Sequence, residues 1–511
     1  MRRLRVKLGI DFGTTRIIVA AADRGNYPLL DFETPEGTCD WFPSLIACRG
    51  GDVRYGWDAW QVQTDPSWAI LRSVKRHLER SGPQTCLRVG NRDYALVDLL
   101  GGLTHALRQA LLAHFRPNEP LEAMIGVPAN ANGNQRFLTM DAFQNAGFKV
   151  VGLLNEPSAA AIEFGHRQKM KGQLLVYDLG GGTFDASLVE MGDGVHIVLD
   201  AEGISNFGGE DFDLALAELA AGKDNLYSLD LSEVFRLLEE CRRHKEALHP
   251  NSRRIVVDLE AAREGWGQAT VAVSDFYDAC RPLLDQSVRI AARLAQGRDI
   301  EALYVTGGGS ELPLVARVLR EEFGRKVKRS EYTRSATAIG LAIQADATSG
   351  YKLREIFHRN FAVWREGNAG SKMILDTIFP RGTRLPSAGE PSPTVSRVYR
   401  PIHNVGDFRY LEASHIDTGN EPKGDVTAWD QIRFPFDPEL AQMASLDSIP
   451  VQASPRAESQ EIEESYMCDA AGVVTVVIRN RTANYEREYR LGRWSGITAP
   501  RSVLRGRVHK A

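Results

Sequence analysis

The sequence predicts an α/β domain over residues 1–349 followed by an all-β sandwich domain over residues 361–499. In the first region, short apolar runs typical of strands alternate with longer helical patterns. After about Tyr351, β-branched and aromatic runs separated by Pro, Gly, Asn and Asp take over, and helix-length patterns become rare. One strand-and-loop layout occurs twice in the first region, which indicates a duplicated half-domain. We expect a linker over residues 350–360 and a basic tail over residues 500–511.

The strands and helices of the α/β domain are expected in alternation along the chain. Short apolar runs predict strands at residues 4–10, 123–127, 174–177, 195–199, 255–259 and 302–305. Patterns of helical period predict helices at residues 97–115, 134–146, 212–220, 231–248, 273–294 and 314–323. In the β domain, strands are expected at residues 361–364, 407–414, 430–437, 472–480 and 484–491.

The composition is that of an ordinary soluble protein and excludes several classes. Of the 511 residues, 43% are hydrophobic and 25% are charged, and the formal net charge of −4 lacks the basic excess of a broad nucleic-acid binder. No apolar run approaches the ~18 residues that span a bilayer, and Asp11 interrupts the N-terminal apolar run too early for a signal peptide. The six cysteines form no CxxC pair and no zinc-binding spacing. We therefore expect a cytoplasmic protein with reduced thiols that binds neither nucleic acid nor a membrane.

Two similar loops predict a binding site for a polyphosphate with a divalent cation. LGIDFGTT (residues 8–15) and VYDLGGGT (residues 176–183) share an apolar strand, an aspartate, an apolar residue, glycine and threonine. Glycine lets backbone N–H groups approach a ligand, threonine adds hydroxyl donors, and aspartate suits a hydrated metal ion. One such loop is a weak signal because Asp-x-Gly turns are common, but two in one domain are expected to clamp the phosphates between them. The residues concerned are Asp11, Gly13, Thr14 and Thr15 in the first loop and Asp178, Gly180, Gly181, Gly182, Thr183 and Asp185 in the second.

Two further glycine runs precede predicted helices. TGGGSELP (residues 306–313) follows a predicted strand, and FGGEDFD spans residues 207–213. Glycines there would let a ribose or a flat ring approach the backbone, although each run alone could equally be a plain turn. The glycines concerned are Gly208 and Gly209 in one run and Gly307, Gly308 and Gly309 in the other. There is no GxxxxGK[ST] motif, so the sequence is not that of a P-loop ATPase.

Five motifs together resemble the 70-kDa heat-shock chaperone family, within the actin-like ATPase superfamily. They are DFGTT at residues 11–15, VPANANGNQR at 127–136, NEPSAAA at 155–161, DLGGGTFD at 178–185 and FGGEDFD at 207–213. NEPSAAA closely followed by DLGGGTFD is the most specific signal, because sugar kinases and filament-forming actin relatives share the first loop but not that pair. The resemblance implies an actin-like, ribonuclease H-like duplicated ATPase domain. It continues more faintly into the β domain through IFPRGTRLP (residues 378–386) and DAAGVVTV (residues 469–476), which look like strands of the family's peptide-binding sandwich.

The resemblance implies a role for each matching residue. Asp11, Asp178 and Asp185 would hold a hydrated Mg2+ ion and a nearby monovalent cation such as K+. Lys75 matches the lysine that reaches the γ-phosphate, and Glu156, with Asp178 and Thr183, would order the attacking water. The glycines and threonines of both loops would bind the phosphates of ATP or ADP. The remaining positions expected to contact the nucleotide are Gly208, Gly209, Arg242, Lys245, Gly307, Gly308 and Gly309.

The base end of the expected nucleotide site departs from the family pattern. In the family, adenine lies between two basic side chains, and an acidic residue contacts the nucleoside. Here the predicted helix keeps Lys245 but has Arg242 at the acidic position and Glu246 at a basic one, and Glu311 occupies the second basic position. A carboxylate cannot supply the stacking of a guanidinium. Arg242 and Glu246 are four residues apart on one helix and are expected to pair with each other. We therefore expect nucleotide binding that is weaker or less selective for adenine.

Three further departures concern partners and coupling. A basic and aromatic segment, residues 350–364, stands in place of the family's acidic, leucine-rich linker. Gly152 stands where bacterial members place an arginine that docks J-domain co-chaperones, which makes such a co-chaperone doubtful. No helical lid is expected after the sandwich, so a bound peptide would exchange quickly.

The sequence supports one function best and leaves an alternative open. The favoured function is that of an ATP-binding, slowly ATP-hydrolysing chaperone relative whose β domain binds unfolded polypeptide. The alternative is a non-enzymatic scaffold or regulator that uses nucleotide as a structural ligand and binds one dedicated partner protein. The complete phosphate-binding set favours hydrolysis, whereas the altered base end, linker and lid favour a specialised role. A sugar kinase or filament protein is disfavoured, because NEPSAAA is present and a C-terminal β domain has no place in those proteins.

Overall fold

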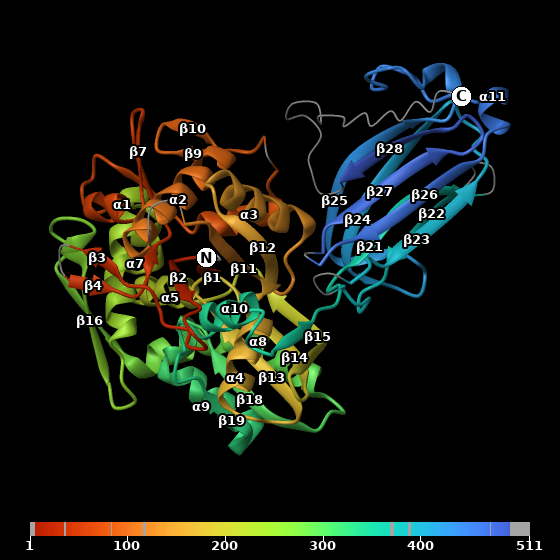
Figure 1. The fold of residues 1–511 in the computed structure, drawn as a ribbon. Coiled ribbons are helices and arrows are strands. Elements are labelled where there is room, and N and C mark those ends of the chain that lie inside the picture. Colours follow the sequence, from red (N-terminus) through yellow and green to blue (C-terminus); the bar gives the residue numbers. More distant parts are fainter. Residues whose placement is uncertain are drawn as a thin grey trace. The chain divides into compact units, whose positions relative to one another are not determined.

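A computed structural model of the chain describes residues 6–34, 37–82, 84–115, 119–367, 372–386, 390–470 and 472–490. The chain forms two compact units (Figure 1). The first unit covers most of the chain up to Leu353, and the second begins at Arg354 and includes two short earlier segments, residues 79–84 and 132–138. The expected basic tail lies outside the described residues.

The first unit contains two mixed β-sheets with the same strand layout (Figure 1). The first sheet has the order β12 (Lys149–Asn155), β11 (Leu121–Val127), β1 (Val6–Phe12), β2 (Arg16–Ala21) and β5 (Phe42–Pro43). The second has the order β19 (Val327–Arg329), β18 (Ile300–Thr306), β13 (Gly172–Leu179), β14 (Phe184–Met191), β15 (Val195–Ile204) and β20 (Lys352–Arg354). Each sheet contains an antiparallel hairpin, β1–β2 or β13–β14. Two further strands, parallel to the first strand of the hairpin, continue the sheet on that strand's side. This repetition confirms the duplicated half-domain. We call the two parts the first and second halves of the unit.

The two strands on either side of the second loop are buried along almost their whole length. Every residue of β13 from Leu174 to Leu179 is buried, and β14 is buried along almost its whole length. Strands covered on both faces read as continuous apolar runs, which is why β13 was recognisable in the sequence. Strand β14 was not predicted, because Asp185, Ser187 and Glu190 interrupt its apolar residues. Smaller sheets complete the unit: β3 (Phe32–Thr34) with β4 (Gly37–Cys39), β7 (Asp52–Tyr55) with β6 (Leu45–Arg49) and β8 (Ala69–Arg72), β9 (Cys86–Val89) with β10 (Arg92–Ala95), and β16 (Arg254–Asp258) with β17 (Gln268–Ala272).

The helices begin and pack as their sequences dictate. On α8 (Val273–Ala295) the buried residues Phe276, Cys280, Leu284 and Ala291 recur at helical spacing and face the core. Helix α9 (Pro313–Phe323) has its proline in the first turn, where the missing N–H costs nothing. The other helices of the α/β region are α1 (Trp57–Val62), α2 (Leu96–Leu111), α3 (Gly133–Asn145), α4 (Glu156–Arg167), α5 (Gly209–Ala221), α6 (Lys223–Tyr227), α7 (Leu231–Glu246) and α10 (Ala336–Ala345).

The second unit is a β-sandwich. One sheet has the order β22 (Lys372–Phe379), β21 (Asn360–Gly367), β24 (Val405–Ile416) and β25 (Pro422–Pro435), and the other β23 (Thr394–Tyr399), β26 (Ile462–Cys468), β27 (Val474–Asn480) and β28 (Tyr485–Arg490). A short helix, α11 (Pro455–Glu458), precedes β26. Phe361 and Tyr410 of the first sheet share one buried apolar cluster with Tyr466 and Val476 of the second. The second unit is therefore the all-β sandwich that the sequence predicted for this part of the chain.

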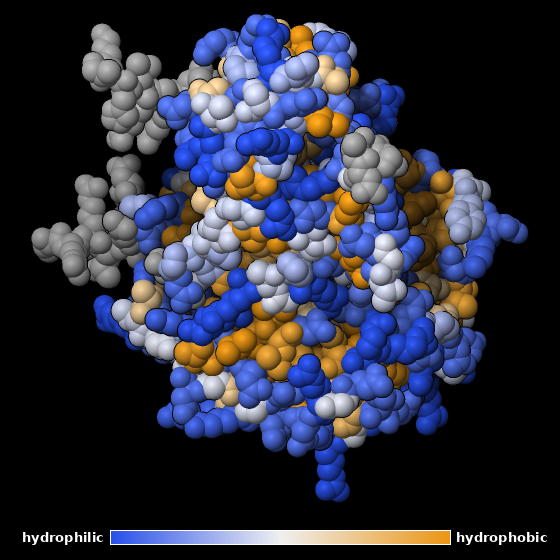
Figure 2. Space-filling view, turned by 90° about the vertical axis from the view of Figure 1, so that its right-hand side faces the viewer, coloured by the Kyte–Doolittle hydropathy of each residue, from blue (hydrophilic) through white to orange (hydrophobic). Residues whose placement is uncertain are grey.

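The surface is mixed in character. On the face drawn in Figure 2, hydrophilic residues predominate and hydrophobic residues form separate areas among them, as is usual when apolar atoms contribute more than half of a protein's surface. Within the described residues, no helix has the length and apolar character needed to cross a membrane.

Candidate functional site

The two predicted loops face each other in the first unit. A Cβ atom at position 181, in the loop after β13, would lie 2.2 Å from Oγ1 of Thr15, in the loop after β1. A Cβ atom at position 182 would lie 2.6 Å from Cγ2 of Thr14. A side chain at either position would force Thr14 or Thr15 to shift, so glycine allows the loops to approach this closely. Two segments more than a hundred residues apart therefore close on one site, as the sequence predicted.

Acidic residues from both halves gather beside these loops. Burial raises the pKa of Asp11 to about 7; the neighbouring Glu156 adds to this rise, and Lys75 opposes it. Burial, followed by the charges of Glu156 and Asp11, raises the pKa of Asp178 well above its usual range. The pKa of Asp185 is raised to about 7 by burial and by Glu156. A bound cation would favour the charged form of all three aspartates, so this donor set fits a divalent ion with phosphate.

Lys75 and Glu156 form the buried ion pair of the site. Lys75 lies on a 3₁₀ helix, η1 (Val74–Arg80), and donates a hydrogen bond to Glu156, the first residue of α4. Their relative exposures are only 4% and 7%. Pro157 in the first turn fixes the start of α4 and hence the position of the carboxylate. The structure thus brings together Lys75, Glu156 and the aspartates of both loops.

The aspartates do not form a direct metal cage. In the part of the chain that the structure describes, no three Asp, Glu, His or Cys side chains are arranged to hold a metal ion. Mg2+ usually keeps several water ligands and takes one or two carboxylates plus phosphate oxygens, so it does not require such a cage. The metal roles of Asp11, Asp178 and Asp185 stay predictions.

The other two glycine runs border the second loop. A Cβ atom at Gly208 would lie 2.6 Å from the backbone of Gly181, and the Gly209 N–H donates to the Gly180 carbonyl at 2.9 Å. Lys245 of α7 donates to the Gly209 carbonyl at 2.6 Å and forms an ion pair with Asp213 at 2.6 Å. Both runs expected to contact nucleotide therefore lie at the site, since the run that contains Gly307, Gly308 and Gly309 lies against Asp178 and Gly180.

The expected pairing of Arg242 with Glu246 is wrong. Arg242 binds Glu239 at 2.6 Å, one turn earlier on α7. Glu246 instead accepts hydrogen bonds from Arg16 at 2.8 Å and from Arg334 at 3.4 Å. Arg16 follows the first loop and Arg334 precedes α10, so both partners are distant in sequence. Local helix spacing could not reveal them.

A chain of ion pairs consequently includes Glu246 and Glu311, the two residues that the sequence placed at the expected base end of the site. It runs from Arg16, whose guanidinium lies 5.0 Å from the Trp41 ring, through Glu246 to Arg334 and on to Glu311. Sequence reasoning identified the two glutamates but missed the two arginines. The one available signal was charge balance, because two carboxylates in a partly buried site require cations nearby.

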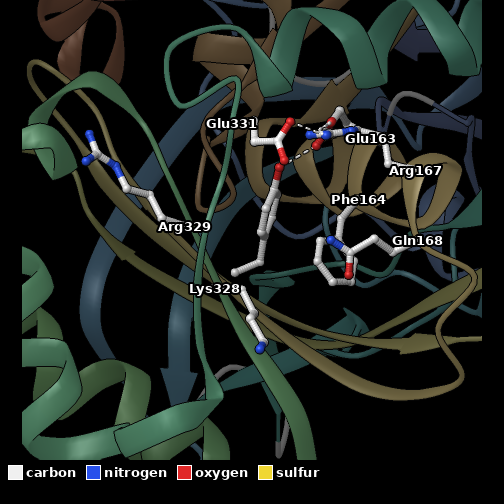
Figure 3. A pocket seen from close by; sticks show the side chains of 8 residues that line it. Glu163, Phe164, Arg167, Gln168, Lys328, Arg329 and Glu331 are labelled. Carbon is white, nitrogen blue, oxygen red and sulfur yellow. Dashed lines mark hydrogen bonds and ion pairs between the residues drawn. The ribbon is translucent and has the colours of Figure 1, made fainter.

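A separate small cavity lies away from the loops. It has a volume of about 30 Å3 and lies between α4 and the edge of the second sheet formed by β18 and β19 (Figure 3). Glu163 and Glu331 both pair with Arg167, and the Tyr304 hydroxyl donates to Glu163. The cavity has space for only one or two water molecules, so it is too small for a nucleotide.

Comparison with known proteins assigns the chain to a family. A family model described as "Hsp70 protein" matches residues 7–361. The chain belongs to the Hsp70 family. The matched range includes all five motifs and every residue of the site, so the family resemblance in the sequence is confirmed.

Individual Hsp70 relatives are similar to the chain over most of its length. The chain is 28% identical over 413 residues to "Chaperone protein DnaK" of Thermotoga neapolitana, covering 74% of this chain and 66% of that protein. It is 32% identical over 417 residues to "Chaperone protein HscA homolog" of Burkholderia multivorans, covering 75% and 65%. A second HscA homolog, of Burkholderia cenocepacia, is 29% identical over 517 residues, covering 94% and 77%. The chain thus spans about two thirds of the length of the first two relatives.

Proposed function

We propose that this Hsp70-family chain binds Mg-ATP between its two glycine loops, hydrolyses it slowly, and acts as a chaperone on polypeptide through its β-sandwich unit. The observation that carries the proposal is the approach of Thr14 and Thr15 to Gly182 and Gly181. This approach of the two loops surrounds one site with backbone and hydroxyl donors from both halves of the unit. Mg2+ bound there would neutralise phosphate charge.

We assign the residues of the site different roles in hydrolysis. Thr14, Thr15 and the backbone N–H groups of Gly180–Gly182 donate to phosphate oxygens. Lys75, held by Glu156, neutralises the charge that develops on the γ-phosphate. Glu156 and Thr183 orient the attacking water. Because hydrolysis of this kind is mainly positioning and charge neutralisation, each such contact is worth on the order of 100- to 1000-fold in rate.

The chaperone part of the proposal rests on two supports. The relatives named above carry the word chaperone in their names, and the second unit is a two-sheet sandwich, the fold that the family resemblance implies for this part of the chain. The non-enzymatic scaffold stays the second candidate. Glu246 and Glu311 favour it, because they replace basic residues expected at the base end of a family ATPase.

Two measurements on the full chain separate these candidates. Phosphate release from Mg-ATP under single-turnover conditions should be slow but measurable. A fluorescently labelled unfolded polypeptide should bind and show a changed anisotropy when ATP is added. Nucleotide binding without phosphate release and without polypeptide binding would reject the chaperone and support the scaffold.

A further inference from the structure

We propose that Arg334 forms the surface on which the nucleobase stacks, and that the site consequently discriminates weakly between bases. This inference rests on the proposed nucleotide binding and adds a residue that determines base selectivity. Three observations support it. The glycine run at residues 307–309 leads toward Arg334, two glutamates hold the Arg334 guanidinium, and a buried donor of Arg16 has no hydrogen-bond partner among the described residues.

The glycine run after β18 leads from the phosphate loops to Arg334. Gly307 has a φ of +84°, and a Cβ atom there would lie 2.4 Å from Oδ1 of Asp178. A Cβ atom at Gly309 would lie 2.5 Å from the Gly180 carbonyl oxygen. Both ends of the run therefore lie against the second phosphate loop. Between them, a Cβ atom at Gly308 would meet only Cγ of Arg334, at 3.8 Å, among the described residues. The space beside Gly308 and Arg334 is thus where a nucleoside could extend from its phosphates.

The guanidinium of Arg334 is held in place by hydrogen bonds from its N–H groups to two glutamates. Its Nε and Nη2 donate to Oε2 of Glu311 at 2.8 and 2.5 Å, and Nη2 also donates to Glu246 at 3.4 Å. These bonds fix the plane of the group, while 36% of the side chain stays exposed. A planar guanidinium fixed in this way offers its flat face for stacking. Every base has a π-face, so stacking alone tolerates base changes. The two glutamates therefore orient the arginine that the sequence pattern had suggested was missing.

Arg16 approaches the same carboxylate from the first half of the unit. It donates to both oxygens of Glu246, at 3.1 and 2.8 Å, and its guanidinium lies over Trp41. Its Nε is buried and has no hydrogen-bond partner in the described part of the chain. A buried donor without a partner is costly unless a ligand satisfies it. A ribose hydroxyl or a base nitrogen could accept this hydrogen bond.

The test compares ligands with and without a base. Calorimetric titration of the wild-type chain with Mg-ATP, Mg-GTP and Mg-tripolyphosphate should give ATP and GTP affinities within about fivefold of each other. Arg334→Ala and Arg334→Lys should each weaken Mg-ATP about tenfold, because lysine keeps the charge but not the plane. Both variants should bind tripolyphosphate within about twofold of the wild type. Arg317→Ala, which removes another arginine of the second half that lies over an aromatic ring, should change nothing.

Each outcome is decisive. Full ATP affinity in Arg334→Lys, or equal losses of ATP and tripolyphosphate affinity, would overturn the stacking role. Strong selectivity of the wild type for ATP over GTP would overturn the proposal that the site discriminates weakly between bases. If the wild type bound neither ATP nor tripolyphosphate, the proposed function itself would fail. Circular dichroism would confirm that each variant is folded.

Discussion

The ammonium group of Lys75 is the most buried positive charge near the phosphate loops, with a relative exposure of 4%. Burial by itself would lower the pKa of Lys75, but Glu156 and Asp11 outweigh this effect, so the pKa is raised. The group is therefore charged at neutral pH without exposure to solvent. A charge held in this way needs no reorganisation when phosphate charge develops.

Replacing this lysine should remove catalysis more than binding. Lys75→Ala is expected to lower the single-turnover rate of phosphate release about 100-fold or more, because an oriented charge at the γ-phosphate is lost. Lys171→Ala is the control, since Lys171 is exposed and pairs with Asp193 on the surface. A rate for Lys75→Ala equal to that of the control would remove Lys75 from the mechanism.

His196 is a second residue whose burial has a measurable consequence. Its ring on β15 is 2% exposed, lies 5.6 Å from the Tyr351 ring, and has no hydrogen-bond partner at either nitrogen among the described residues. Burial lowers the pKa of His196. In the unfolded chain His196 becomes protonated below about pH 6.5, whereas in the folded chain its protonation requires a lower pH.

The sign of this effect gives a pH prediction. The folded pKa lies below the unfolded value, so stability is complete above about pH 6.5 and is lost as the pH falls toward the folded pKa. His196→Phe keeps a ring beside Tyr351 but removes the titration. The decrease in the free energy of unfolding between pH 7.5 and pH 5.5, measured by urea denaturation, should be smaller in this variant. An unchanged decrease would contradict the assignment.

Among the strands, β21 and β26 of the sandwich are joined by an ion pair whose carboxylate is fully buried. Arg365 donates to both oxygens of Glu464, at 3.0 and 2.7 Å, and to Asp376 of β22 at 2.7 Å. Glu464 has no exposed surface, and the Tyr466 hydroxyl also donates to it. The pair links the two sheets of the sandwich, because β21 and β26 belong to different sheets.

Removing one member of this pair should destabilise the second unit strongly. Arg365→Ala is expected to cost about 3–5 kcal/mol, because it leaves the Glu464 charge buried without its cation. Arg397→Ala, which breaks a more exposed pair with the same Asp376, should cost about 1 kcal/mol or less. Urea denaturation of both variants measures the difference. Equal costs would show that the sandwich does not depend on the buried charge.

Some elements were predictable from the sequence and others were not, for physical reasons. Helix α8 has one apolar side, so its periodicity marks it clearly. Helices α4 and α10 were not predicted, because small residues such as Ala159 and Ala338 bury them on nearly every side and leave no polar stripe. The start of α9 was predicted, since Pro313 is a local signal.

Across the whole molecule, the site was predictable where a motif is local and missed where it is assembled over distance. The two loops could be matched because each carries its aspartate, glycine and threonine within a few residues. Arg16 and Arg334 were missed, because their shared partner Glu246 is 230 residues from one and 88 from the other. Long-range ion pairs follow from the fold and leave no spacing in the sequence.

Thermal unfolding with and without Mg-ATP, on the wild type and on Asp178→Asn, tests most directly whether the two loops enclose one magnesium nucleotide. Ligand at about 100 times its Kd should stabilise the wild type by about 2.7 kcal/mol. Asp178→Asn, which keeps the shape of the side chain but removes its charge, should lose most of that stabilisation. No shift in the wild type would contradict nucleotide binding, and an equal shift in both proteins would contradict the role of the second loop.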